Sequence, residues 1–149
     1  MTRKINTSTK AVITKKFIGC ITKCGNRTRA VKIFDTFLYN LKIKFDLPPL
    51  DFLEVIIELC RPKVFIISKK VAGMSHKIPV PVSKSKSYSM AIKWFLASSR
   101  KRGAAPIVSL ILDEIIDLYS NPSNQILKKR DEYHRLAKLN RPFLRYHRF

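Results

Sequence analysis

Three clusters of basic side chains are the groups in this chain best suited to chemistry, and that chemistry is the binding of a polyanion. Arg27 and Arg29 follow a glycine turn, Lys69 and Lys70 flank the expected tip of a hairpin, and residues 128–130 are three cations that open a C-terminal helix. Cations at the start of a helix oppose its dipole, at a cost of roughly 0.3 kcal/mol or more per charge. Bound phosphate would reverse that sign, so we predict that the cluster at 128–130 contacts a polyanion.

Candidates for catalysis or metal binding are weaker. Cys20 and Cys24 are four residues apart and would share a helix face, but a zinc site needs a second close pair of ligands, which neither Cys60 nor the three scattered histidines supply. The acids of segment 113–117 could imitate a metal-binding cluster, but we expect them on a solvent-exposed helix face, balancing nearby cations. With four glycines and no Ser/His/Asp pattern, we expect no enzyme, no cofactor and no metal site.

The charge of the whole chain agrees with a polyanion partner. Its 149 residues carry 30 Lys and Arg against 10 Asp and Glu, a net charge of +20, and 46% are hydrophobic, which is too many for a disordered basic tail. All ten acids lie within 35–58 and 113–132, so segments 1–34, 59–112 and 133–149 have none. Three separate cationic segments suggest several footprints on one folded RNA, and the aromatic residues interleaved with the last segment suit RNA as well.

The spacing of apolar residues predicts the elements that position these clusters. Helical periodicity extends over 9–23, 27–44, 49–60, 86–101, 106–119 and from 127 to an interruption at Pro142. Between the third and fourth helices, β-branched residues and a strict alternation around Pro79 and Pro81 predict a two-stranded hairpin over about 63–83, with its tip near 72–76. We therefore expect a mainly α fold, a six-helix bundle with a protruding hairpin, in one domain spanning residues 1–149.

A DNA-binding regulator and a membrane-surface protein are the two alternatives to an RNA-binding protein. A DNA-binding regulator of winged-helix-like type should concentrate its contacts in one recognition helix, whereas basic residues are spread over all segments here. A membrane-surface protein would need a cationic helix face opposite exposed apolar groups. The apolar faces here are needed for the core, and no apolar run approaches the roughly 18 residues of a membrane span. We expect no membrane association.

Several short motifs follow one another in the same order as in a known protein family. From about residue 12 to the end of the chain they are Gly25–Arg29, Val71-Ala72-Gly73, Ile78-Pro79-Val80, Ala91-Ile92-Lys93-Trp94, Arg100-Lys101-Arg102, Lys128–Asp131, Leu136-Ala137, Asn140 and Tyr146-His147-Arg148. Together they resemble the small-subunit ribosomal protein seven family. Ala72, Pro142 and Phe149 depart from the family pattern, at a glycine, a proline-free stretch and a terminal tryptophan respectively.

The resemblance implies a structural constituent of the small ribosomal subunit that binds the 3′ major domain of its rRNA and organises assembly of the head. It also implies a hairpin near the exit site, beside mRNA and exit-site tRNA, and contacts with neighbouring head and platform proteins rather than with a second copy of itself. Trp94 is expected in the core rather than stacked on RNA. The RNA-binding residues carried over or expected are Arg27, Arg29, Lys69, Lys70, Lys77, Lys93, Lys101, Arg102, Lys128, Lys129, Arg130, Arg135, Arg141, Tyr146 and Arg148.

Localisation rests on finer features. The Arg-Thr-Arg after Gly25 and the single glycine at the hairpin look most like mitochondrial members of the family. The resemblance begins soon after Met1, so we expect no cleaved targeting peptide, and the abundance of Ile, Lys, Phe and Asn suggests an AT-rich genome. These features predict a mitochondrial, organelle-encoded protein, with plastid or bacterial cytoplasm as alternatives.

Overall fold

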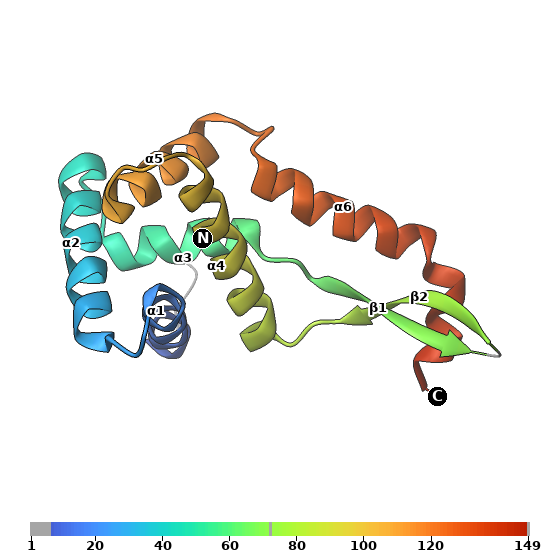
Figure 1. Cartoon of the computed structure of the whole chain (residues 1–149). Helices are drawn as coiled ribbons and strands as arrows, with labels where there is room; N and C mark the ends of the chain where they lie inside the picture. The colour runs from blue at the N-terminus through green and yellow to red at the C-terminus, as the bar shows by residue number, and fades with distance from the viewer. Residues whose placement is uncertain (1–6, 72, 149) are drawn as a thin grey trace.

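The chain forms a body of α-helices from which a β-hairpin protrudes (Figure 1). The structure, a computed structural model, describes residues 7–71 and 73–148. Its elements in order are α1 (Thr7–Ile21), α2 (Arg27–Phe45), α3 (Pro49–Cys60), β1 (Val64–Val71), β2 (Met74–Pro81), α4 (Lys84–Lys101), α5 (Ile107–Ser120), α6 (Gln125–Leu139) and the 3-10 helix η1 (Arg141–Arg148). The predicted mainly α fold, with a hairpin between the third and fourth helices, is confirmed. Ala72 and Phe149 lie outside the described residues.

Polar caps fix the starts of α2 and α6. Asn26 accepts a hydrogen bond from the Arg29 N–H (3.1 Å) and begins α2. Asn124 accepts from the Ile126 N–H (2.8 Å) and begins α6 at Gln125, two residues earlier than predicted. The cations at 128–130 therefore start at the fourth helical residue, and the prediction that they open the helix is wrong. The helix dipole therefore disfavours these cations less than expected, because its effect fades beyond the first turn.

The end of α1 corrects the expectation for the cysteines. The helix ends at Ile21, and Cys24 lies in the following turn with φ +50°. Cys24 is therefore exposed beyond the helix and does not share a helical face with Cys20. Cys60 is buried, and burial raises the pKa of its thiol to about 12. Its sulfur consequently stays protonated at neutral pH, which does not suit a metal ligand.

A cluster of phenylalanines joins three helices at the centre of the body. The ring centroid of Phe17 in α1 lies 5.3 Å from that of Phe34 and 5.7 Å from that of Phe37, both in α2. It lies 6.2 Å from the ring of Phe95 in α4. None of the four side chains is more than 2% exposed. Apolar residues of α3 and α5, such as Ile57 and Ile111, complete the same core.

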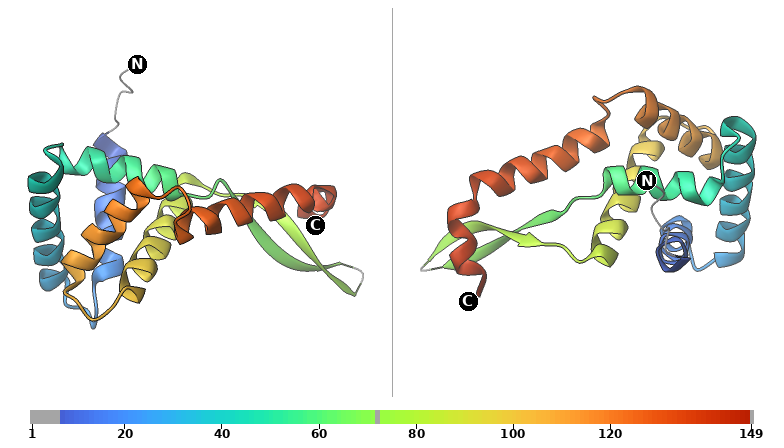
Figure 2. Two further views of the ribbon diagram at one scale, coloured as in Figure 1. Left: turned by 90° about the horizontal axis from the view of Figure 1, so that it is seen from above. Right: turned by 180° about the vertical axis from the view of Figure 1, so that it is seen from behind.

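The hairpin projects from this body, and the C-terminal segment runs beside it (Figure 2). The two strands pair antiparallel with Val64 opposite Pro81 and Val71 opposite Met74, so the tip is shorter than predicted. A two-stranded ribbon is weak alone, and here β1 packs against α6 and β2 packs against η1. We call β1, β2, the second half of α6 and η1 the arm. α6 ends before the interruption predicted at Pro142, and η1 continues the chain as an element the sequence analysis missed.

We predict that replacing Phe17 with alanine destabilises the protein by about 3–5 kcal/mol, because it leaves a cavity among three other buried rings. Replacing Tyr39 with alanine is the control, since Tyr39 is 66% exposed and should change the stability by less than about 0.5 kcal/mol. Urea unfolding followed by circular dichroism measures both. Equal midpoints for the two variants would contradict the central role of Phe17.

Candidate nucleic-acid interface

The first predicted cluster lies at the start of α2 and gains two cations from elsewhere in the chain. Arg27 and Arg29 are both exposed. Arg29 lines a hollow of about 550 Å³ together with Lys23, which follows α1, and Arg100, near the end of α4. Arg100 also donates from Nη2 to the backbone carbonyl of Cys20 (3.4 Å), which holds α4 against the end of α1. Lys23 and Arg100 were missed as site residues, although Arg100 stands in a run of three cations in the sequence.

The cations of α4 and α6 divide into exposed and engaged groups. Lys93, Lys101, Lys128 and Lys129 are exposed, which suits contact with phosphates. Arg130 is half-buried, and its guanidinium donates to the Leu59 carbonyl (2.7 Å) and pairs with Asp131 (2.7 Å). Because the contact with Leu59 ties α6 to the end of α3, Arg130 has a structural role that is independent of RNA.

Trp94 is half-buried and packs against the core, in line with the expectation for it. The ring of Tyr133 in α6 lies 5.2 Å from the ring of Trp94, and the ammonium of Lys129 lies 5.0 Å from its centroid. A cation over an indole face is attracted by the ring quadrupole. Trp94 therefore helps to dock α6 onto α4 and to orient Lys129.

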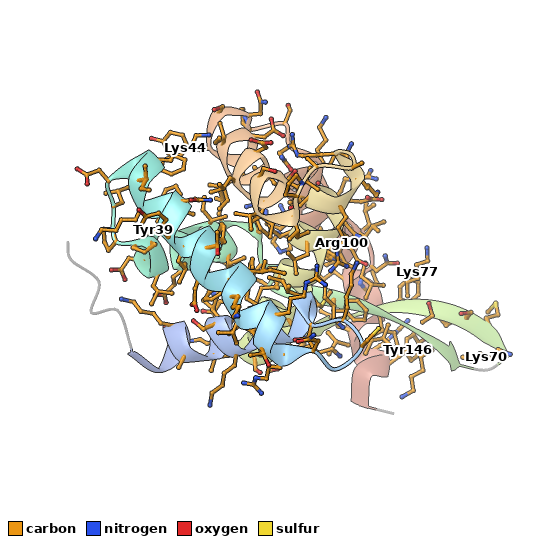
Figure 3. All side chains as sticks on the ribbon, turned by 60° about the vertical axis from the view of Figure 1, so that its left-hand side comes forward. Tyr39, Lys44, Lys70, Lys77, Arg100 and Tyr146 are labelled. Atoms are coloured by element: carbon orange, nitrogen blue, oxygen red, sulfur yellow. The ribbon has the colours of Figure 1, made fainter. Side chains whose placement is uncertain are left out.

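The arm carries its predicted residues along its length. Lys70 and Lys77 in the strands and Arg135 and Arg141 in the C-terminal segment are exposed, while Lys69 is half-buried. In Figure 3, Lys70, Lys77 and Tyr146 lie toward the arm and Arg100 lies on the body, whereas Tyr39 and Lys44 mark the opposite end on α2. The side chain of Arg148 lies outside the part of the chain that the structure describes.

Tyr146 is held by other rings. Its ring lies 5.6 Å from that of His76 and 6.3 Å from that of Phe143, and the guanidinium of Arg145 lies 5.1 Å from its centroid. His76 and Phe143 are themselves 4.9 Å apart. These rings fasten η1 to β2, so the structure assigns Tyr146 a packing role that the sequence analysis did not anticipate.

Arg102 is engaged with acids of α5. Its Nε pairs with Glu114 and its Nη2 pairs with Asp117 (2.7 Å). Glu114 is fully buried, so the prediction that this acid lies on the solvent-exposed face of the helix is wrong for Glu114. Asn124 adds a hydrogen bond to each carboxylate, at 3.1 and 2.8 Å. The side chain of Asn121, then Arg102, hold the pKa of Asp117 below its usual value.

His134 links α6 to the base of the hairpin. Its Nε2 accepts a hydrogen bond from the Lys63 backbone N–H (3.1 Å), so the neutral imidazole carries its proton on Nδ1. Burial lowers the pKa of His134, and the nearby charge of Arg130 lowers it further. The neutral form is therefore the one that supports this contact at physiological pH.

Among residues 7–71 and 73–148, no group of three or more His, Cys, Asp or Glu side chains is placed to hold a metal ion. The helices within the same ranges are too short or too polar to span a membrane. What the described residues bring together is instead a set of exposed cations distributed from the start of α2 to the arm.

Comparison with known proteins agrees with this arrangement. Residues 2–141 match the family model described as ribosomal protein S7p/S5e. The chain is 32% identical to the small ribosomal subunit protein uS7 of Psychromonas ingrahamii over 147 residues, which cover 97% of this chain and 94% of that protein. It is 31% identical to the uS7 of Chloroflexus aggregans over 138 residues, or 93% of this chain and 87% of that one.

The chain belongs to the ribosomal protein S7p/S5e family. Members of this family are structural ribosomal proteins, which confirms that the chain is not an enzyme. Its place is within a ribosome, in the small subunit, where S7p/S5e proteins take part in translation together with small-subunit rRNA and other ribosomal proteins. The relatives named above are bacterial. The contacts made by individual residues stay predictions.

We predict that Arg102→Ala destabilises the protein by about 2 kcal/mol, because it leaves the buried Glu114 carboxylate without its cation. Lys101→Ala removes an exposed neighbouring cation and should cost less than about 0.5 kcal/mol. Adding Glu114→Gln to Arg102→Ala should recover part of the loss, because no buried charge is left. Chemical denaturation measures all three, and equal stability of the two single variants would refute the structural role of Arg102.

We predict a loss of stability on acidification that depends on His134. Its pKa in the folded protein lies below that in the unfolded chain, so as pH falls through about 6.5 the unfolded chain binds a proton that the folded form resists. The melting temperature of the wild type should therefore fall more steeply between pH 7.5 and 5.5 than that of His134→Gln. All other titrating groups are shared by the two proteins, and parallel curves would show that His134 has no part in the effect.

Proposed function

We propose that this protein binds the 3′ major domain of small-subunit rRNA as a monomer, with residues 1–149 acting as one unit, and organises assembly of the subunit head. The observation that carries the proposal is the spread of exposed cations over the start of α2, the length of α4 and α6, and the arm. Such a spread matches an RNA that folds around the protein. A single recognition helix would concentrate these cations, which disfavours the DNA-binding alternative.

The proposed phosphate contacts differ in how available each side chain is to RNA. Arg102 and Arg130 are already committed to internal partners, and Tyr146 is committed to packing. Among the other predicted residues, the exposed cations are the stronger members of the interface, and they are Arg27, Arg29, Lys70, Lys77, Lys93, Lys101, Lys128, Lys129, Arg135 and Arg141.

The arm is proposed to lie near the exit site, beside mRNA and exit-site tRNA, with head and platform proteins as neighbours. Two features support this. The hairpin extends beyond the helical body, so it can reach a ligand that the body does not touch (Figure 2). Lys70 and Lys77 are exposed on it, which suits contact with a second nucleic acid.

For the compartment, we propose a mitochondrial ribosome with an organelle-encoded gene. The proposal is supported by the resemblance of the Arg-Thr-Arg segment after Gly25 to mitochondrial members and by the abundance of Ile, Lys, Phe and Asn. The bacterial relatives fit the alternative of a bacterial cytoplasm, and a plastid is the third choice. Locating the gene in organellar or chromosomal DNA decides among the three.

We predict that the protein co-sediments with small ribosomal subunits in a density gradient and stays bound at moderate salt. Electrostatic contacts alone would weaken steeply as salt rises, but a folded, multi-site interface should hold. Detection by mass spectrometry across the gradient provides the measurement. Recovery of the protein free of ribosomes at low salt would overturn the proposal.

We also predict that Lys128→Ala with Lys129→Ala weakens binding to a transcript of the 3′ major domain and lowers the slope of log K against log salt by about 1–2. Arg130 is left intact because it holds the end of α3. The matched control is Lys42→Ala with Lys44→Ala, two exposed cations at the far end of α2. Filter binding at four salt concentrations gives both slopes, and an unchanged slope in the α6 variant would exclude these lysines from the interface.

A further inference from the structure

A groove of about 710 Å³ separates the base of the hairpin from α6 and η1. Figure 1 shows the backbone of this region, in which α6 and the strands run from the helical body toward η1. This volume falls within the roughly 300–1,000 Å³ of pockets that hold small molecules. The apolar part of its lining, which we call the floor, consists of Val64, Pro79, Pro81, Ala137 and Leu144.

The rest of the lining is mostly cationic, and we call this cationic part the rim. Lys63 stands at the hairpin base, and Arg135, Lys138 and Arg141 stand on the C-terminal segment. The acid that lines the groove, Asp131, is paired with Arg130 at 2.7 Å. An occupant that complements this lining must combine an apolar surface with negative charge at its edge.

Two features narrow the choice of occupant. Pro79 and Pro81 have the same parity in β2 and lack N–H groups, so this strand cannot offer donors there to an added peptide strand. His134 lines the groove with an imidazole whose Nε2 is occupied by the Lys63 N–H, which leaves Nδ1–H as a donor for a heterocyclic acceptor. A planar base with an attached phosphate meets all of these conditions.

We propose that this groove binds one unpaired nucleotide of RNA, with its base on the apolar floor and its phosphates on the cationic rim. The inference rests on the proposed RNA-binding function and deepens it by assigning one site to a splayed-out base. Bases in a duplex are stacked and paired, so only a loop, a bulge or a single strand can supply this ligand. Lys63 and Lys138, which the sequence analysis did not single out, thereby become binding residues.

The test compares two probes of equal charge on the full chain, hexauridylate and an abasic ribose-phosphate hexamer. We expect hexauridylate to bind about tenfold more tightly, with methyl NMR shifts concentrated at Val64, Ala137 and Leu144. Equal affinity for the two probes, or shifts elsewhere only, would overturn the proposal. Tighter binding of an acidic, leucine-rich peptide than of hexauridylate at the same residues would overturn it in favour of a protein occupant.

A groove-filling variant supplies the second measurement. Ala137→Leu adds bulk to the floor without changing charge and should abolish the preference for hexauridylate, while Thr36→Leu, at an exposed position of α2, should keep it. Retention of the preference in Ala137→Leu would refute the site. Both variants are then run in the ribosome gradient: loss of base preference with intact co-sedimentation supports the groove alone, whereas wild-type protein that fails to co-sediment refutes the proposed function independently.

Discussion

A two-stranded hairpin cannot bury either of its faces by itself, and most features of the C-terminal third of the chain follow from that constraint. The rings of Phe65 and Tyr133 lie 5.9 Å apart and join β1 to α6. Farther along the arm, the ring of His76 contacts the rings of Phe143 and Tyr146 of η1. In the sequence, the aromatic residues of the C-terminal segment suggest stacking on RNA. In the structure, these rings hold the hairpin in place. The cations of the arm are presented on a scaffold that these rings stabilise.

The scarcity of acids has a comparable effect on the cations. Glu114 and Asp117 pair with Arg102 and so join α5 to the end of α4, whereas Asp131 pairs with its neighbour Arg130 within α6. An arginine that is paired with a buried carboxylate is costly to remove, since the carboxylate is left without compensation. Acids therefore mark which cations are structural. Lys10 and Arg61 are paired as well, with Asp51 and Glu58. Most of the remaining cations are exposed and keep the chain strongly positive, as binding to a polyanion requires.

Periodicity predicted the helices because their apolar faces are continuous, as Phe34, Phe37 and Leu41 in α2 are all buried. The hairpin followed from the alternation around Pro79 and Pro81, which no helix tolerates. Local pattern could not reveal that Glu114 is buried, because its compensation by Arg102 and Asn124 depends on how α4, α5 and the start of α6 meet. Nor could it show that Lys23, Arg29 and Arg100 share one hollow, since these side chains come from three separate segments.

The ring contact between α6 and β1 and the groove beside it both follow from the same geometry. Tyr133 contacts the hairpin through Phe65, and the neighbouring residues, His134 and Val64, line the groove. A helix that touches a twisted ribbon through large rings cannot follow it closely along its whole length, because the ribbon twists while the helix axis stays nearly straight. The space between them is lined by the aliphatic and proline side chains that the rings do not cover. Since positive charge dominates this end of the chain, that space acquires a cationic rim without any residue being added for the purpose.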